Sequence, residues 1–307
     1  MEKVAILFNP SSGRGLSLKK KDDIKATLVK NSISYKWFNS ESEEHLKELA
    51  RKKARSFETI LVVGGDTSFQ IVASEIYQSS YNPALCMIPT GSANDIALSL
   101  GCGSIESIIE SLKTMKTRMI DLGLLEIKDY PENIYFVGSL SLGLGVTINQ
   151  FVAQYWKNHP IQAKLGNVLQ VIAGLQGARY SFKKHKVPMK IQLDSHDFKN
   201  EVDFSIIVFS NVPCYAGGFQ VCPSTSPFDG ILNCSVINTR SFTHTTRLAY
   251  SIWKQKHRNK KEIQALNAVS FTARSKKPIN VQYDGKVISG VKKFKVSALP
   301  SALKILG

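Results

Sequence analysis

The sequence predicts an α/β protein in which a domain built on a parallel sheet is followed by a second, mainly antiparallel domain. In about the first 125 residues, short apolar segments alternate with helical patterns, which is typical of a parallel sheet covered by helices on both faces. Beyond that point, strand patterns follow one another at hairpin-like spacing, which favours antiparallel pairing. A chain of 307 residues is long enough to bury a core in each domain.

Four apolar segments that end in turn-forming residues predict the strands of the first domain. They cover residues 3–8, 34–38, 58–66 and 84–89. Helical patterns follow each of them, at residues 17–31, 40–56, 67–79 and 92–100. In the second of these helices, Leu46 and Leu49 share one face. Glu43 and Glu44 come early in that helix, where its dipole favours carboxylates.

Strand patterns dominate the second domain, and helical patterns interrupt them. The expected strands cover residues 134–146, 186–194, 203–212, 230–238 and 268–274. The expected helices cover residues 147–157, 160–178 and 242–256. We place the linker near Lys128–Glu132, so that the first domain covers residues 1–128 and the second covers residues 129–294.

The charge balance points to anionic partners. The chain has 40 Lys and Arg against 24 Asp and Glu, a formal net charge of +16, which suits nucleic acid, an anionic membrane surface or phosphorylated small molecules. The five cysteines are an odd number without a CxxC pair, which fits a reducing cytoplasm better than a disulfide framework or a zinc ribbon. The first apolar run is too short for a signal peptide, and glycines interrupt the uncharged stretch from Asn133 to Trp156. No membrane span is therefore predicted.

The turn Gly64-Gly65-Asp66 follows an apolar strand and precedes a helix. Ligands of parallel sheets bind at the carboxyl ends of the strands, where the amides of the next helix favour anions. Glycine lets a phosphate approach the backbone, and an aspartate beside it can bind Mg²⁺ through water. The alternative is a tight turn with a solvated aspartate.

A second turn of this kind, residues 89–95 (PTGSAND), follows the next strand. Here Ser92 or Asn94 could simply cap the following helix. Because two such loops at neighbouring strand ends each carry an acid, we predict a nucleotide-phosphate site. Asp121, after the apolar pair Met119-Ile120, is either a third strand-end carboxylate or a turn residue.

Together these motifs resemble the diacylglycerol kinase catalytic domain family, which includes soluble bacterial lipid kinases and the sphingosine and ceramide kinases. The resemblance covers essentially the whole chain in the right order. Its motifs are Asn9-Pro10 with Gly13 and Gly15, Gly64-Gly65-Asp66, residues 89–95, Asp121-Leu122-Gly123, Gly143 and Gly145, Asn211 to Gly218, Asp229-Gly230, and Asp284-Gly285. Residues 89–95 are the most specific part, since NAD kinases and phosphofructokinases share the Gly-Gly-Asp turn.

The resemblance implies a NAD kinase/diacylglycerol kinase-like fold, with a nucleotide-binding α/β first domain, a β-sandwich second domain and a cleft between them. It implies ATP-dependent phosphorylation of a lipid hydroxyl. It also implies that the chain end, residues 295–307, returns to the first domain. Asp284 would be the general base, and Asp66 would act with Asp95 and Asp121 in organising Mg²⁺. The residues that would hold ATP are Asn9, Gly13, Gly64, Gly65, Thr67, Thr90, Gly91, Ser92 and Asn94. The local sequence by itself favours a simple hairpin turn at Asp284-Gly285.

Several positions depart from the family pattern. Thr67 stands where the family has the glycine of Gly-Gly-Asp-Gly, and a β-branched residue is unfavourable there if that position needs a positive φ. Ile71 and Lys286 replace acids, and Phe228 replaces the first aspartate of Asp-Asp-Gly, which weakens any structural metal site beside Asp229. An alternative is therefore a catalytically weak or inactive relative that binds lipid or nucleotide for regulation. A NAD kinase-like enzyme is a third candidate, which residues 89–95 disfavour.

Two basic clusters are candidates for contact with an anionic membrane surface, although both could be solvated loops. They comprise Lys254, Lys256, Arg258, Lys260 and Lys261, and Lys183, Lys184 and Lys186. Nucleic-acid binding is not expected, because no nucleic-acid-binding motif is present. Metalloenzyme and serine-hydrolase functions have no support in the histidine spacing or in a Gly-x-Ser-x-Gly motif. We expect a cytoplasmic, peripherally membrane-associated kinase of a diacylglycerol-like or sphingoid lipid, and the family suggests a homodimer.

Overall fold

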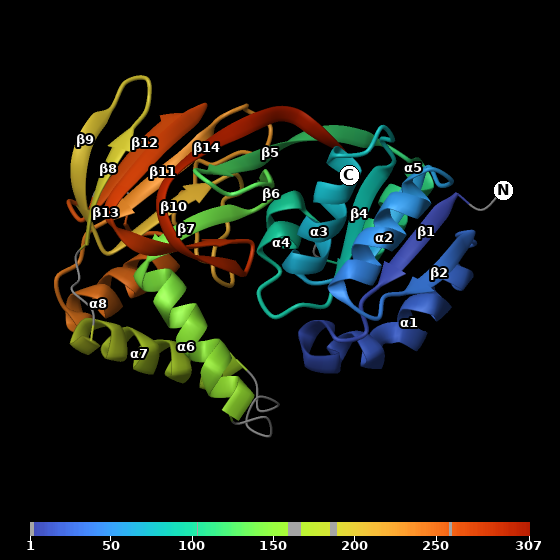
Figure 1. The fold of residues 1–307 in the computed structure, drawn as a ribbon. Helices are drawn as coiled ribbons and strands as arrows, with labels where there is room; N and C mark the ends of the chain where they lie inside the picture. Colours follow the sequence, from blue (N-terminus) through green and yellow to red (C-terminus); the bar gives the residue numbers. More distant parts are fainter. Residues whose placement is uncertain (1–2, 103, 159–166, 185–188, 258–259) are drawn as a thin grey trace.

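The computed structural model describes residues 3–102, 104–158, 167–184, 189–257 and 260–307. Within these residues the strands form one 14-stranded sheet that continues through both domains. Figure 1 shows the first domain, with β1 to β4, at one end of the molecule and the β-sandwich domain at the other. The predicted fold class is confirmed.

The first domain has a parallel sheet in the order β4-β3-β1-β2. Its strands are β1 (Val4–Phe8), β2 (Tyr35–Asn39), β3 (Thr59–Gly64) and β4 (Ala84–Pro89). Its helices are the 3₁₀ helix η1 (Ser12–Gly15), α1 (Leu16–Lys30), α2 (Glu43–Ala54), α3 (Asp66–Tyr77), α4 (Asp95–Leu100) and α5 (Ile105–Thr114). The strands β1, β3 and β4 are buried on both faces, which explains their continuous apolar sequences.

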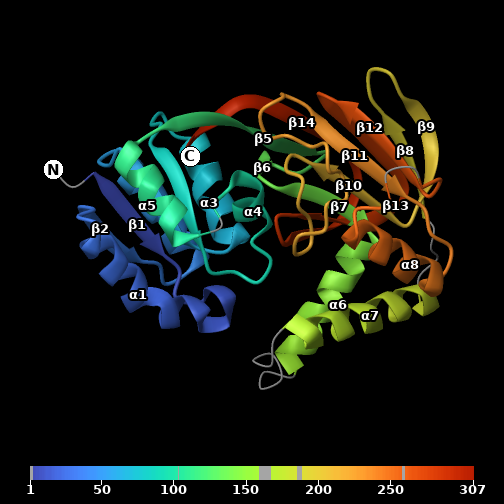
Figure 2. The same ribbon diagram turned by 180° about the vertical axis from the view of Figure 1, so that it is seen from behind.

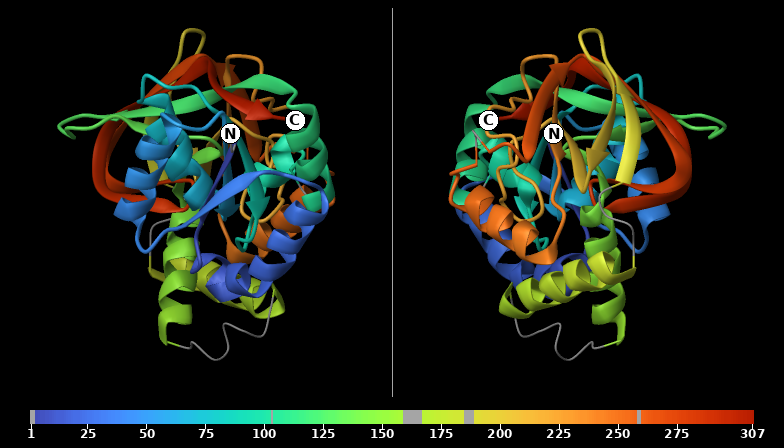
Figure 3. Two further views of the ribbon diagram at one scale, coloured as in Figure 1. Left: turned by 90° about the vertical axis from the view of Figure 1, so that its right-hand side faces the viewer. Right: turned by 90° about the vertical axis from the view of Figure 1, so that its left-hand side faces the viewer.

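The second domain is antiparallel, and its core is separate from that of the first. Its strands are β6 (Ile134–Phe136), β7 (Ser139–Gly143), β8 (Met189–Asp194), β9 (Lys199–Phe204), β10 (Ile206–Ser210), β11 (Leu232–Ile237), β12 (Ile263–Ala268) and β13 (Ser270–Tyr283). Its helices are α6 (Leu144–Asn158), α7 (Asn167–Lys184) and α8 (Phe242–Trp253). These three helices lie together on one side of the domain, as the end-on views of Figure 3 show.

Two long strands, β5 (Thr117–Ile127) and β14 (Lys286–Leu306), pair with each other and run through both domains (Figure 2). In β5, Leu122 packs in the first core and Leu125 packs in the second. Gly123 lies between them, where a Cβ atom would come within 2.0 Å of the Phe136 ring. The chain therefore passes between the cores inside a strand, ahead of the predicted linker at Lys128–Glu132.

The strand β14 crosses between the domains in the opposite direction to β5. Val296 lies in the second core, whereas Leu303 and Ile305 lie in the first core. Ile305 pairs with Leu85 of β4, so the last residues of β14 extend the parallel sheet. The sequence analysis identified neither β5 nor β14 as a strand, because charged and apolar residues alternate irregularly along both.

Three predicted strands of the second domain have other boundaries. Residues 134–146 are not one strand: they form β6 and β7, and α6 already begins at Leu144. Residues 203–212 fall into β9 and β10, because Ser205 leaves the strand and donates its hydroxyl to the Thr239 carbonyl. The strand predicted at residues 268–274 extends to Tyr283, and β12 was not predicted. Of the predicted helix 160–178, residues 160–166 lie outside the described residues.

Candidate active site

Three loops meet at the carboxyl ends of β1, β3 and β4, as expected for a parallel sheet. Their glycines allow backbone to touch backbone. A Cβ atom on Gly91 would lie 2.7 Å from the Cα atom of Gly65, and one on Gly13 would lie 2.0 Å from the Thr90 carbonyl oxygen. A side chain at these positions would push the loops apart, so the three glycines define the shape of the site.

Polar side chains hold the same three loops in place. Asn9 donates its amide to the Ser68 hydroxyl at 2.8 Å. Asn94 clamps its own loop: it accepts the Gly91 N–H and donates to the Gly91 carbonyl, both at 2.9 Å. The buried Thr90 hydroxyl contacts that of Ser17 at 2.5 Å, so it supports the loop from beneath. Ser92 is exposed at the loop surface.

The helices that follow two of these loops begin without a side-chain cap. The N-cap residues are Gly15 for α1 and Gly65 for α3, so neither N-cap has a side chain to bond the amides of the first turn. At the start of α1, however, the Leu16 N–H already bonds the Ser12 and Gly13 carbonyls of η1. Uncapped N–H groups at a helix start carry partial positive charge and attract anions. The start of α3, beside the glycine loops that follow β1 and β4, therefore suits an anionic group such as a phosphate.

Asp66 opens α3 and caps the neighbouring helix α4. Its carboxylate accepts the N–H groups of Asp95 and Ile96, each at 3.1 Å. The pKa of Asp66 is raised to about 6: burial is the largest cause, the charge of Asp95 acts in the same direction, and these hydrogen bonds oppose the rise. The cap of α4 therefore comes from Asp66, and neither Ser92 nor Asn94 caps it.

Asp95 joins the first domain to the second. Its carboxylate accepts the backbone N–H of Gly217 and, at 2.7 Å, that of Gly218. Both glycines have positive φ angles, 90° and 93°, which turn their amides toward the carboxylate. Burial raises the pKa of Asp95, while these hydrogen bonds lower it. The sequence analysis gave no role to this glycine pair, although it lies in a motif that supported the family resemblance.

Asp284 occupies the hairpin turn between β13 and β14, with φ angles of 39° at Asp284 and 90° at Gly285. Its carboxylate accepts three successive backbone N–H groups, from Val137 at 2.7 Å, Gly138 at 3.0 Å and Ser139 at 2.9 Å. Burial raises the pKa of Asp284 to about 6, the three amides lower it, and the charge of Asp66 raises it. Asp284-Gly285 is therefore a hairpin turn, as the local sequence predicts, and the same turn holds the carboxylate that the family resemblance singles out.

The aspartates Asp66, Asp95 and Asp284 lie close enough for the charge of one to affect the pKa of the next. We call them the carboxylate cluster. Thr67 ties the cluster together, because its hydroxyl donates to the Asp284 carbonyl at 3.1 Å. Thr67 lies in the first turn of α3 and does not have a positive φ angle, so the strain considered for a β-branched residue does not arise.

Asp121 was expected either at a strand end or in a turn, and the structure places it in neither. Asp121 lies inside β5, is 2% exposed, and its carboxylate accepts the N–H of Gly230 at 2.7 Å and of Ser301 at 2.8 Å. Ser301 lies where the register of β14 against β5 shifts, and its φ angle is 49°. Asp121 thus bonds the Ser301 amide where β14 is irregular and the Gly230 amide of the loop before β11, and its carboxylate is not part of the cluster.

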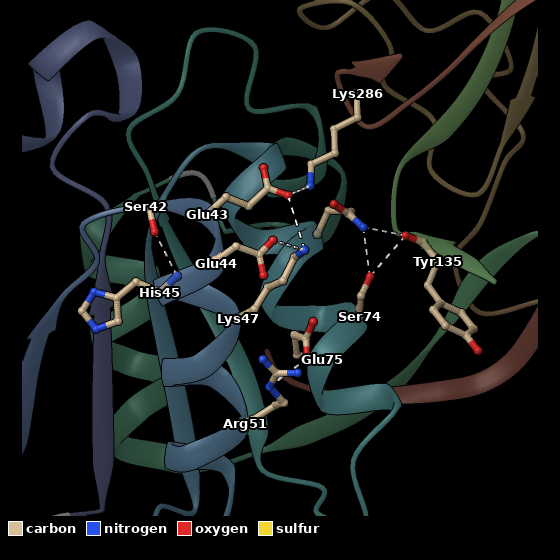
Figure 4. Close-up of polar contacts among 11 residues, drawn as sticks. Ser42, Glu43, Glu44, His45, Lys47, Arg51, Ser74, Glu75, Tyr135 and Lys286 are labelled. Carbon is tan, nitrogen blue, oxygen red and sulfur yellow. Dashed lines mark hydrogen bonds and ion pairs between the residues drawn. The ribbon is translucent and has the colours of Figure 1, made fainter. Parts of the chain in front are cut away.

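Of the residues that replace family acids, Ile71 is buried in the first core, whereas Lys286 contacts the other domain. Gln70 and Ser74 of α3 also reach across to the second domain. Lys286 reaches across from β14 to Glu43 of α2, and Figure 4 shows the two side chains pointing toward each other. Gln70 donates its amide to the Tyr135 carbonyl of β6 at 2.7 Å, and Ser74 donates to the same oxygen. These positions hold α2 and α3 against the second domain.

The carboxylates of the candidate site match the ligands of a Mg²⁺ ion only in part. Among the residues that the structure describes, no group of three or more His, Cys, Asp and Glu side chains gathers in a metal-binding arrangement. In kinases, however, Mg²⁺ commonly binds one or two carboxylates and completes its shell with water and phosphate oxygens. Asp66 and Asp95 supply two neighbouring carboxylates of this kind. Asp229 instead accepts the Ile231 N–H, and the ring of Phe228 packs under Arg118.

Of the larger basic cluster, Lys254, Lys256, Lys260 and Lys261 are exposed at and beyond the end of α8. Arg258 and the side chains of Lys183, Lys184 and Lys186 lie outside the described residues. No helix in the described parts of the chain is long and apolar enough to cross a membrane.

Comparison with known proteins matches both halves of the chain to domain families. The diacylglycerol kinase catalytic domain matches residues 3–125, and the YegS C-terminal NAD kinase β-sandwich-like domain matches residues 139–307. A diacylglycerol kinase of Mycobacterium tuberculosis is 25% identical over 99% of this chain and 94% of its own length. A protein of Enterobacter sp. (strain 638) called "probable lipid kinase YegS-like" is 24% identical over 98% of this chain and 94% of its own length.

Solved structures share the fold. The crystal structure of a diacylglycerol kinase from Bacillus anthracis strain Sterne superposes with a TM-score of 0.69 at 15% identity, over 99% of this chain and 96% of that one. A second structure from the same strain reaches a TM-score of 0.76 at 18% identity, over 99% of this chain and 95% of that one.

Proposed function

Because the chain belongs to the family of the diacylglycerol kinase catalytic domain and the YegS-like lipid kinases, we propose that it phosphorylates a lipid hydroxyl group with ATP. The acceptor would be a diacylglycerol-like or sphingoid lipid. The observation that carries this proposal is the carboxylate cluster, in which Asp284 from the second domain lies beside Asp66 from the first. Phosphoryl transfer needs such a meeting of a hydroxyl acceptor site with a phosphate site.

In this proposal the triphosphate lies along the three glycine loops. The uncapped amides at the start of α3 would bind its oxygens, with Asn9, Gly13, Gly64, Gly65, the Thr67 amide, Gly91, Ser92 and Asn94 forming or supporting the loops. Bound Mg²⁺ would neutralise phosphate charge, held by Asp66 and Asp95. The buried Thr90 and Asp121 side chains are assigned to supporting the fold.

Asp284 is proposed to take the proton of the lipid hydroxyl. As the lipid oxygen forms its bond to the γ-phosphorus, the bond from that phosphorus to the bridging oxygen breaks and ADP leaves. A pKa near 6 suits a general base at neutral pH, because the group is then ionised yet still basic enough to accept a proton. The three backbone amides fix the position of the carboxylate, and as hydrogen-bond donors they cannot themselves accept the proton of the lipid hydroxyl.

A regulatory protein that binds nucleotide without turnover is the second candidate. Two observations favour it: the Thr67 side chain fills space beside Gly285, and Lys286 is paired with Glu43 instead of facing a phosphate. Either contact could restrict the approach of the two substrates. Cytoplasmic location, peripheral association with a membrane and a homodimer remain part of the proposal and are independent of the choice between the two candidates.

One assay separates the candidates. The purified protein is incubated with radiolabelled ATP, Mg²⁺ and a panel of diacylglycerol-like and sphingoid lipids in mixed micelles, and label in the lipid fraction is counted. Asp284→Ala is expected to lower the rate at least a hundredfold, in the range of the loss of a general base. Asp197→Ala removes an exposed aspartate of the same domain and serves as the matched control.

Thermal unfolding of both variants shows whether the fold survives. Labelled lipid that disappears only with Asp284→Ala supports the kinase. ATP binding by calorimetry, with no labelled product from the wild-type protein, supports the regulatory candidate instead. Equal rates for wild type and Asp284→Ala would contradict the role of Asp284.

A further inference from the structure

The helix α8 exposes a large aromatic pair. The Tyr250 side chain is 61% exposed and that of Trp253 is 60% exposed, and their ring centroids lie 6.0 Å apart. The opposite face of the helix is buried, because Leu248 and Ile252 pack against Val208 and Ile237 of the sandwich. An exposed tryptophan beside an exposed tyrosine is unusual on a protein surface that faces only water.

Cations surround this aromatic pair. Arg247, three residues before Tyr250, is exposed on the same face of the helix. Lys254 places its ammonium group 4.3 Å from the centre of the Trp253 ring, and Lys256 and Lys260 follow. The sequence has no Asp or Glu between Asp229 and Glu262. The patch therefore combines aromatic rings with positive charge and has no acid of its own segment to neutralise it.

The patch on α8 lies apart from the carboxylate cluster. Figures 1 and 2 show α8 beside α7, in the part of the molecule that lies away from β1 to β4. The two helices pack against each other, and α7 exposes two further apolar side chains, those of Leu175 and Tyr180. The helical layer is thus the most aromatic surface that the described residues of the second domain present.

We propose that the α8 patch, made of Arg247, Tyr250, Trp253, Lys254, Lys256 and Lys260, docks on an anionic lipid bilayer with the two rings in the headgroup region. Tryptophan and tyrosine prefer the membrane interface, where the ring is in an apolar environment and its polar atom is hydrated. Lysine and arginine near an anionic leaflet each strengthen binding about fivefold. Charge complementarity and the aromatic pair together favour a bilayer over a folded acidic partner or a nucleic acid.

The proposed kinase gives this docking a purpose, because long acyl chains stay in the bilayer and the enzyme must come to them. Docking itself does not require turnover, so it can be tested without ATP. The intact wild-type protein is sedimented with vesicles of phosphatidylcholine alone and with vesicles of phosphatidylcholine that also contain phosphatidylglycerol as the anionic lipid. Binding is expected only to the anionic vesicles and should fall steeply with salt.

Variants then locate the contact. Tyr250→Ser with Trp253→Ser is expected to weaken vesicle affinity at least tenfold, and Lys254→Glu with Lys256→Glu at least twentyfold. The matched control is Val29→Ser with Lys30→Glu on α1, a helix that also exposes apolar side chains and lysines but carries Asp22 and Asp23. The control should bind like the wild type.

Fluorescence tests the depth of the rings. The chain has three tryptophans, so Trp37→Phe with Trp156→Phe leaves Trp253 as the only one. Its emission should shift to shorter wavelength with anionic vesicles and stay unchanged with neutral ones. Equal binding to both vesicle types, an unshifted emission, or a larger effect of the α8 variants on a single-stranded RNA oligonucleotide than on vesicles would overturn the proposal.

An assay of kinase activity on a short-chain, monomeric lipid, which needs no membrane docking, tests the proposed function independently of the α8 patch. The α8 variants should phosphorylate that soluble lipid at the wild-type rate. A wild-type protein that binds anionic vesicles through α8 but phosphorylates no lipid would overturn the kinase and leave the docking surface standing.

Discussion

At the scale of single residues, backbone amides hold each carboxylate of the candidate site in a fixed position. Asp66, Asp95 and Asp284 each accept two or three N–H groups, so their positions are fixed before any ligand arrives. The amides favour the charged form, yet burial outweighs them and raises the pKa of all three groups. Opposing effects of this size are typical of functional carboxylates.

The raised pKa of Asp66 predicts a pH dependence of stability. With a pKa of about 6 in the folded protein and 3.8 as the ordinary value, the native state binds the proton more tightly than the unfolded state. The stabilisation is complete below about pH 4 and is lost as the pH rises through about 6, which removes on the order of 3 kcal/mol. Asp66→Asn has no such titration, so the difference in unfolding free energy, wild type minus variant, should fall over this range.

Urea unfolding at several pH values from 4 to 7, with EDTA present, measures this difference. Asp197→Asn, at an exposed aspartate, is the control for the removal of a carboxylate. Wild-type and Asp66→Asn curves that run parallel across the range would contradict a raised pKa at Asp66.

At the scale of elements, the loops depend on glycine contacts. Gly65 and Gly91 belong to loops after different strands, and each lies where a Cβ atom on the other would collide with it. Asn94 locks the second loop in a left-handed conformation with a φ angle of 57° and clamps Gly91. The two loops therefore keep their shape only as a pair.

Gly91→Ala is expected to abolish most nucleotide binding. The new methyl group would lie 2.7 Å from the Gly65 Cα atom and 2.9 Å from the Asn94 side-chain oxygen, and the backbone must move to relieve the overlap. Overpacking of this kind costs about 1–3 kcal/mol of stability. Calorimetry with ATP measures the affinity, and an affinity within threefold of wild type would contradict the role of the paired loops. Gly174→Ala in α7, where the nearest atom would be 3.9 Å away, is the matched control.

At the scale of the whole molecule, the two domains share a sheet. The strands β5 and β14 contribute to both cores, and β14 pairs with β4 in one domain and β13 in the other. Thr67, Gln70, Asp95 and Lys286 add polar contacts between the domains. Neither domain can complete its sheet alone, because each would lose a strand that the other also uses.

The shared sheet predicts a single cooperative unfolding transition. Trp37 in β2 reports on the first domain, and Trp253 in α8 reports on the second. Variants that retain only Trp37 or only Trp253 of this pair should have the same midpoint of urea unfolding, because all probes of a two-state protein report the same transition. Circular dichroism of each variant serves as the control for altered stability. Midpoints that differ between the fluorescent probes, at unchanged overall stability, would show that the domains unfold independently.

Some features of this protein follow from the sequence alone. The parallel strands of the first domain, the glycine turns after them and the antiparallel character of the second domain are local patterns, because apolar runs, turn residues and helical spacing act over a few residues. The Asp284-Gly285 turn was equally visible, and its position in the family pattern pointed to a functional role. The family itself was recognisable because its motifs occur in order along the whole chain.

Only the tertiary structure decided which residues meet. Asp284 lies more than two hundred residues from Asp66 in the chain, and their proximity depends on the pairing of β13, β14 and β7. Asp121 has the same local appearance as the site aspartates, yet an irregularity in β14 turns it into a support for backbone amides. In the sequence, Thr67 and Lys286 stand in place of a glycine and an acid of the family pattern. In the folded protein, both form contacts that join the two domains. Long-range strand pairing depends on complementary surfaces that no single segment encodes, which is why these contacts could not be predicted from the sequence.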